Sequence, residues 1–244
     1  MRAATCRWRG WALAALVAAG SGCGGEPEPR VDAARARLEA EAGQVRQALQ
    51  SQPDSPVLLF QLGMVFERHG ALDSAAAAYR RATTAHAAFP QAHYQLGQAE
   101  YRLGHVDAAV AAYTQAVRFD PEYAEAYNNL GFLHRKQGDL DAAEAAYLEA
   151  LRCDSSFAQA HNNLGQVYKE WQDWPRATAC YRRAIDLSPD MEQAYVNLST
   201  AQREMGDVPG EMEALQEMVS RFADSPNGTY AAARLQDLRL LQRD

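Results

Sequence analysis

The sequence predicts an all-α fold, an α-solenoid of five helix pairs. A small residue returns every 34 positions, at Gly63, Gly97, Gly131, Gly165 and Ser199. An Ala-x-x-x-Tyr motif keeps the same interval, beginning at Ala75, Ala109, Ala143 and Ala177. Apolar residues within each unit recur at helical spacing. Two series with one period in separate parts of the unit indicate an internal structural repeat.

Each unit is predicted to be two amphipathic helices joined by a tight turn. In the third unit, Tyr127, Leu130 and Leu133 lie on one helical stripe, and Leu140 and Tyr147 lie on the next. Glycines fall between the two stripes, where a residue past a helix end takes a left-handed backbone, at Gly70, Gly104, Gly138 and Gly206. An aspartate that can cap the second helix follows the turn in three units, at Asp139, Asp173 and Asp207.

The unit resembles the tetratricopeptide repeat, whose 34-residue pattern carries Leu-Gly, then Ala, an aromatic residue and Pro. The resemblance covers roughly Pro56 to Ser225 and is fullest in the third and fourth copies. Single positions depart from the pattern, among them Glu100, His134 and Gln202 in an aromatic position and Gln172 at the turn glycine. The resemblance implies a right-handed solenoid whose first helices line the concave side.

A repeat cannot bury its own apolar face, so the ends of such an array need capping helices. Residues 31–55 form a helical stripe that stops near Pro53, which predicts an N-terminal capping helix. Residues 56–225 hold the five repeats, and residues 226–244 carry a second stripe that predicts a C-terminal capping helix. The whole of 31–244 is therefore expected to be one domain.

The first residues differ in composition from the rest of the chain. Residues 1–22 carry three arginines, no acidic residue and an apolar run too short to span a bilayer, which is typical of a secretory signal peptide. Small residues stand directly before Cys23, and a Gly/Pro-rich tether at 23–30 follows, so the segment resembles a bacterial lipoprotein signal. Lipidation of Cys23 would give an outer-membrane lipoprotein facing the periplasm. The alternative is ordinary cleavage near Gly20 or Gly22 and a soluble exported protein.

Charge and motifs limit the classes of function. The net charge is −7, and loss of the three arginines in residues 1–22 makes it −10, which argues against nucleic acid as a partner. No phosphate loop, nucleophile elbow or metal-ligand spacing occurs, so we expect a non-catalytic protein with no cofactor and no metal. His93 and His161 occupy an aromatic position of the repeat, where packing is the expected role.

The candidate binding residues lie on the first helices. Two residues before each marker Gly or Ser stands a primary amide, in all five repeats: Gln61, Gln95, Asn129, Asn163 and Asn197. An exposed amide has a donor and an acceptor and can pair with the backbone of an extended peptide. The series is similar to the amide ladder in the repeat region of O-linked N-acetylglucosamine transferases, which holds extended peptides. The alternative is that these amides serve folding alone.

A second series lies on the same helical face as the amides. Four residues after the marker come Arg135, Lys169 and Arg203 in the last three repeats, a basic row that would favour peptides with acidic side chains or a free C-terminus. The first two repeats offer an apolar end for an aliphatic or aromatic anchor instead, at Val57, Phe60, Met64, Tyr94 and Tyr101.

These observations predict an exported, lipid-anchored scaffold that binds a protein or an extended peptide in its concave groove. Its only membrane contact would be the lipid on Cys23. Two other interpretations stay open. One is an envelope assembly factor, similar to the repeat lipoproteins that help to build outer-membrane machines or type IV pili, which would use its outer surface. The other is an accessory to a cell-wall enzyme that holds glycan.

Overall fold

The computed structural model describes residues 29–241, and these form twelve α-helices with no strand among them. The signal, Cys23 and most of the tether lie outside the described residues. The helices are α1 (Pro29–Ser51), α2 (Pro56–Arg68), α3 (Leu72–Ala85), α4 (Pro90–Arg102), α5 (Val106–Phe119), α6 (Ala124–Gln137), α7 (Leu140–Cys153), α8 (Ala158–Glu170), α9 (Trp174–Leu187), α10 (Glu192–Glu204), α11 (Val208–Arg221) and α12 (Pro226–Leu241).

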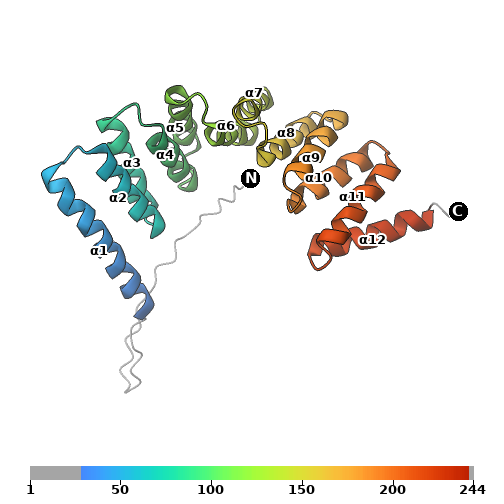
Figure 1. Ribbon diagram of the computed structural model, residues 1–244, viewed down its shortest axis with the longest axis horizontal. Coiled ribbons are helices and arrows are strands. Elements are labelled where there is room, and N and C mark those ends of the chain that lie inside the picture. The colour runs from blue at the N-terminus through green and yellow to red at the C-terminus, as the bar shows by residue number, and fades with distance from the viewer. Residues whose placement is uncertain (1–28, 242–244) are drawn as a thin grey trace, which may run out of the picture.

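The helices follow one another along an open arc from α1 to α12 (Figure 1). Each repeat is one antiparallel pair: the first helices are α2, α4, α6, α8 and α10, and the second helices are α3, α5, α7, α9 and α11. Contacts are made within a pair and between neighbouring pairs, as expected for a solenoid. The predicted all-α solenoid of five helix pairs is therefore confirmed.

The glycine and tyrosine series are two halves of one contact. In the first four repeats, the tyrosine of the second helix lies against the glycine of the first helix: Tyr79 on Gly63, Tyr113 on Gly97, Tyr147 on Gly131 and Tyr181 on Gly165. A Cβ added at Gly131 would lie 2.8 Å from ring carbons of Tyr147. In the fifth repeat the position of the tyrosine is held by Leu215, and there the marker is Ser199. A side chain smaller than tyrosine in the second helix is thus accompanied by a marker residue that has a Cβ in the first helix.

The turns within the pairs have the predicted backbone. Gly70, Gly104, Gly138 and Gly206 have φ between 72° and 87°. In the fourth repeat Gln172 takes the same left-handed conformation, with φ of 59°. Asp139, Asp173 and Asp207 each accept a hydrogen bond from a backbone N–H in the first turn of the following helix. These caps confirm the role predicted for the three aspartates.

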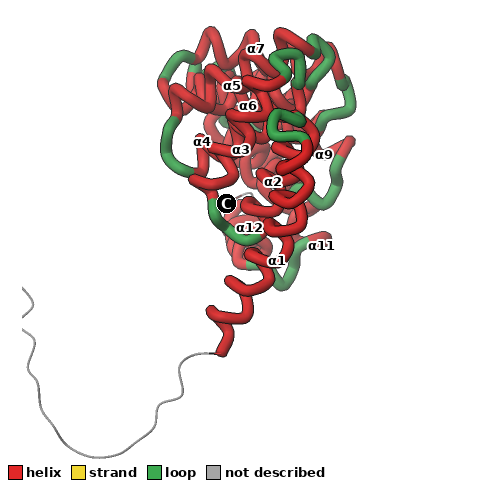
Figure 2. The backbone as a smooth tube through the Cα atoms, turned by 90° about the vertical axis from the view of Figure 1, so that its left-hand side faces the viewer, coloured by secondary structure: helices red, strands yellow, loops and turns green. Residues whose placement is uncertain are grey.

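The two end helices differ in how they fit the repeat. The N-terminal part of α1 projects beyond the stack (Figure 2), and its residues 33–37 are exposed. The later part of α1 packs on the first repeat through Ala42 and Leu49. Helix α12 begins 34 residues after α10, in the register of a further first helix, and buries Ala231, Leu235 and Leu238.

Within residues 29–241, none of the helices has the length and apolarity that a membrane span requires.

Candidate functional site

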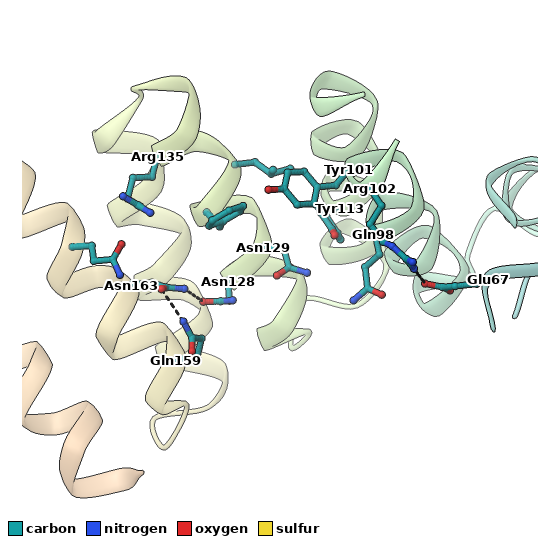
Figure 3. Close-up of a pocket in the computed structure, with 13 residues that line it drawn as sticks. Glu67, Gln98, Tyr101, Arg102, Tyr113, Asn128, Asn129, Arg135, Gln159 and Asn163 are labelled. Atoms are coloured by element: carbon teal, nitrogen blue, oxygen red, sulfur yellow. Dashed lines mark hydrogen bonds and ion pairs between the residues drawn. The ribbon is translucent and has the colours of Figure 1, made fainter. Parts of the chain in front are cut away.

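A cavity of about 580 Å³ opens on the first helices of the array (Figure 3). It extends from α2 through α4 and α6 to α8, with one residue from α5. Six of its lining side chains are primary amides, and three are aromatic. The lining residues are Glu67, Gln98, Tyr101, Arg102, Tyr113, Asn128, Asn129, Phe132, Leu133, Arg135, Gln159, Asn163 and Gln166.

Amides on neighbouring first helices are hydrogen-bonded to one another. Asn163 Nδ2 on α8 donates to Asn128 Oδ1 on α6 at 3.0 Å, and Asn197 Nδ2 on α10 donates to Asn162 Oδ1 on α8 at 2.9 Å. A third link of the same kind joins Asn129 Nδ2 to the Tyr94 hydroxyl at 3.4 Å. In each link the two residues are 35 positions apart. The amide series therefore holds adjacent repeats together.

The expectation that the ladder amides are exposed is wrong for two of them. Asn163 is 7% exposed and Asn197 is 6% exposed. Their carbonyl oxygens are also engaged, because Gln159 donates to Asn163 Oδ1 at 3.0 Å and Gln193 donates to Asn197 Oδ1 at 3.1 Å. The donor of each side chain is thus used by the preceding repeat, and the acceptor is used by a glutamine one turn earlier on the same helix.

Asn129 differs from these two amides. The residue one turn before it is Glu125, which cannot donate a hydrogen bond when ionised, whereas Asn163 has Gln159 in that position. Among the described residues, Asn129 Oδ1 accepts no hydrogen bond, and its Nδ2 has only the long contact to Tyr94. Asn129 is half-buried and lines the cavity, so its amide can serve a ligand.

The remaining residues of the predicted ladder are placed differently. Gln61 is exposed on α2, outside the cavity lining. Gln95 is half-buried on α4, and its Oε1 is buried without a hydrogen bond within the described chain. The residue 35 positions before Gln95 is Phe60, which offers no polar atom. Of the predicted ladder, the cavity therefore brings together only Asn129 and Asn163.

The predicted basic row is partly neutralised by nearby carboxylates. Arg135 Nη1 donates to Glu170 Oε1 at 2.6 Å, in the same 35-residue register as the amide links. Arg203 lies 4.0 Å from Glu204 and contacts the Tyr230 hydroxyl at 3.4 Å. Lys169 is half-buried and has no carboxylate within 4 Å among the described residues. Of the three basic residues in the row, Lys169 is the one whose charge has no carboxylate partner among the described residues.

Two other charged links cross the same side of the array. Arg102 Nη1 donates to Glu67 Oε1 at 2.9 Å, so both charges are balanced at the α2 end of the cavity. Lys136 Nζ donates to the Tyr101 hydroxyl at 3.2 Å and lies 5.1 Å from the centre of that ring. Only the first of these links balances two charges; Lys136 keeps its positive charge, because a neutral hydroxyl and an aromatic ring do not cancel it.

Aromatic side chains form one wall of the cavity. Tyr101 and Phe132 meet edge to face with ring centroids 5.6 Å apart. The hydroxyl of Tyr113 reaches the cavity from α5, and burial raises the pKa of this phenol, so it stays protonated and able to donate. The cavity thus offers neutral donors and acceptors beside aromatic surface.

The two histidines for which a packing role was predicted lie outside the cavity lining and contact neighbouring residues. His93 is buried, its Nε2 lies 2.8 Å from the Ala87 carbonyl, and its ring stacks on Phe119. His161 Nε2 donates to the Ser155 carbonyl at 3.2 Å. Within the described part of the chain, no group of three or more His, Cys, Asp or Glu side chains has the geometry of a metal site.

Sequence reasoning missed the acceptors of the amide links and several cavity residues. Asn128 and Asn162 precede the ladder residues directly, so the repeated Asn-Asn pair was the signal for cross-repeat hydrogen bonds. Gln98, Phe132 and Gln166 stand one residue after the marker glycine and share a face with the ladder. An offset of 35 rather than 34 would have indicated the Asn128–Asn163 and Asn162–Asn197 links.

Stacked helix pairs with a hollow lined by the first helices define an α-solenoid scaffold for protein interaction. Family models described as Tetratricopeptide repeat match residues 29–93, 162–226 and 122–190, and one described as TPR repeat matches residues 97–138. The chain belongs to the tetratricopeptide repeat family. This repeat typically forms a non-catalytic scaffold that binds proteins, and no catalytic family matches.

Solved structures of other repeat proteins share the fold. The MamA protein is 22% identical, with a TM-score of 0.65 over 69% of this chain and 92% of that chain. YrrB, described as a TPR protein with an unusual peptide-binding site, is 15% identical, with a TM-score of 0.66 over 79% of this chain and 99% of that chain. PilF of Pseudomonas aeruginosa is 15% identical, with a TM-score of 0.66 over 85% of this chain and 100% of that chain. No curated protein matches the chain.

Proposed function

We propose that the protein is an exported, lipid-anchored scaffold that binds an extended segment of a partner protein in the cavity on its first helices. The observation that carries this proposal is the cavity itself, which has the volume of a ligand site and crosses four first helices. A groove of that length suits an extended chain better than a compact ligand. The similarity to YrrB is consistent with a peptide ligand, since that protein is described by its peptide-binding site.

The chemistry of the wall suits a peptide backbone. Asn129 presents a carbonyl oxygen without a donor, and Gln166 forms no side-chain hydrogen bond among the described residues. Amides can accept from a peptide N–H and donate to a peptide carbonyl. The neighbouring Tyr101 and Phe132 supply surface for an apolar side chain. Asn163 and Asn197, whose amides are engaged, would support the wall rather than touch the ligand.

The lipid anchor rests on the sequence around Cys23, which lies outside the described residues. Export and attachment through Cys23 would place the groove at the cell envelope, tethered by residues 23–30. An envelope assembly factor that uses its outer surface is the main competing proposal. Its contacts would lie on the second helices, where Leu148 of α7 is 47% exposed.

Site-specific photo-crosslinking in the native host distinguishes these two proposals. A photoreactive residue replaces Gln166 in the cavity or Leu148 on α7, in otherwise identical proteins. Groove binding predicts that one discrete partner is captured from Gln166 and not from Leu148. Capture from Leu148 alone would contradict groove binding and support the outer surface.

A further inference from the structure

The two ends of the cavity differ in chemistry, and this difference defines the ligand further than the proposed function does. The cavity lining begins at Glu67 on α2 and ends at Gln166 on α8. One turn before Glu67 on the same helical face stands Met64, and one turn after Gln166 stands Lys169. Neither residue is part of the lining itself, but they border it with an apolar side chain beyond the α2 end and a cation beyond the α8 end.

The α2 end presents apolar side chains to solvent. Met64 is 42% exposed and Val57, two turns earlier on the same helix, is 55% exposed. Between them lies the exposed amide of Gln61. The charges one turn further along α2 are paired, Glu67 with Arg102 at 2.9 Å and Arg68 with Glu41 at 2.8 Å. An aliphatic or aromatic side chain of a ligand would find contact there without an unpaired charge.

The α8 end presents a cation without a carboxylate partner. The 35-residue register that pairs Glu67 with Arg102 and Arg135 with Glu170 would pair Lys169 with Glu204. No such ion pair forms within 4 Å, and the carboxylate of Glu204 lies 4.0 Å from Arg203 instead. Lys169 and Arg203 together face only one carboxylate, so this end carries net positive charge.

We propose that the groove binds an extended peptide segment with an apolar side chain at one end and a carboxylate at the other. The apolar side chain contacts Met64 and Val57, and the carboxylate pairs with Lys169. This inference rests on the proposed function, because it requires a peptide in the cavity. Successive first helices make few direct contacts, so each step is at least the ~8 to 10 Å of packed helices and three steps span no less than roughly 24 Å. At ~3.3 Å per residue, the two groups are about seven or more residues apart.

A phage-displayed library of twelve-residue peptides, selected on the purified full chain, tests the motif. The selection is repeated on Met64→Glu and Lys169→Glu. The matched controls are Leu148→Glu on α7 and Arg183→Glu on α9, which place the same charge changes on exposed second-helix positions outside the cavity lining. Circular dichroism first confirms that every variant is folded.

The wild type is expected to enrich peptides with an apolar residue about seven or more positions from Asp or Glu. Lys169→Glu should remove the acidic preference and weaken the selected peptides at least tenfold, and Met64→Glu should remove the apolar preference. Both controls should stay within twofold of the wild type. Synthetic peptides with a free or an amidated C-terminus then show by fluorescence anisotropy whether a terminal carboxylate replaces the acidic side chain.

The outcomes separate this inference from the proposed function. Groove binding stands if the enriched peptides lose binding to the Phe132→Ala variant. The two-ended ligand is overturned if those peptides lack the apolar and acidic motif, or if they bind Lys169→Glu as well as the wild type. A library that yields no enriched peptide, or peptides indifferent to both Asn129→Leu and Phe132→Ala, contradicts both.

Discussion

The Nδ2 of Asn163 donates to Oδ1 of Asn128 at 3.0 Å, joining the first helices of two adjacent repeats through buried side chains. Asn197 and Asn162 form the same link in the next pair of repeats. Because water reaches neither partner easily, loss of one side chain leaves a polar group unsatisfied. These amides therefore stabilise the stacking of repeats.

Asn163→Ala is expected to lower the free energy of unfolding by about 1 to 3 kcal/mol, the cost of leaving buried partners without a hydrogen bond. Gln166→Ala, one turn further on α8, removes an amide that has no partner among the described residues and should change stability by less than ~0.5 kcal/mol. Urea denaturation measures both. Equal midpoints for the two variants would show that the buried link is not stabilising.

Gly131→Ala is expected to destabilise the third repeat, because the added Cβ lies 2.8 Å from ring carbons of Tyr147. Overpacking of this kind costs ~1 to 3 kcal/mol. Gly43→Ala makes the same exchange in α1, where a Cβ meets nothing within 4 Å, and should stabilise by up to ~1 kcal/mol. Thermal melts of the two variants should thus shift in opposite directions; shifts of the same sign would refute the packing argument.

Gln172→Gly is expected to raise stability by roughly 1 kcal/mol, because Gln172 is held at φ of 59° and glycine takes this conformation without a Cβ penalty. The reciprocal change, Gly138→Gln at φ of 83°, should lower stability by a similar amount. Chemical denaturation checks both. A Gln172→Gly protein less stable than wild type would mean that the glutamine side chain makes a contribution larger than the backbone strain.

The half-buried His161 should make stability depend on pH. Desolvation lowers the pKa of His161 in the folded protein, while its unfolded value is about 6.5. The unfolded state then binds the proton more readily, so this contribution is present above pH ~6.5 and is lost as pH falls through the folded pKa. His161→Tyr, which copies Tyr195 in the next repeat, should reduce the loss between pH 7 and pH 5. An unchanged pH profile of the melting temperature would exclude this role.

Cys23→Ala tests the anchor predicted from the N-terminal sequence. In the native host, the wild type is expected in the detergent phase after phase separation, and the variant in the aqueous or unprocessed fraction, because the lipid would be attached at this thiol. Mass spectrometry of the mature N-terminus provides the direct measurement. Identical partitioning together with an unmodified N-terminus would favour ordinary cleavage and a soluble exported protein.

The sequence alone determined the repeat and its local chemistry. The interval of 34 residues is carried by contacts within one unit, such as Tyr147 on Gly131, and by turn residues such as Gly138 and Asp139. These features depend on a few neighbouring residues and on backbone conformation, so they leave a periodic pattern in the chain. For the same reason the helix pairs and their caps could be predicted without a structure.

Only the tertiary structure decided which polar residues of the repeats keep a hydrogen-bonding group or a charge without a partner. Asn129 and Asn163 occupy equivalent positions of the repeat, yet Asn163 is closed by Asn128 and Gln159 while the carbonyl of Asn129 stays open. The charge of Arg135 is likewise matched by Glu170, and that of Lys169 is not. The link to Asn128 and the Arg135–Glu170 pair arise between repeats, where stacking brings residues 35 positions apart into contact, whereas the bond from Gln159 lies within α8. A period read along the chain cannot reveal them, because hydrogen bonding and burial depend on how neighbouring helices approach one another.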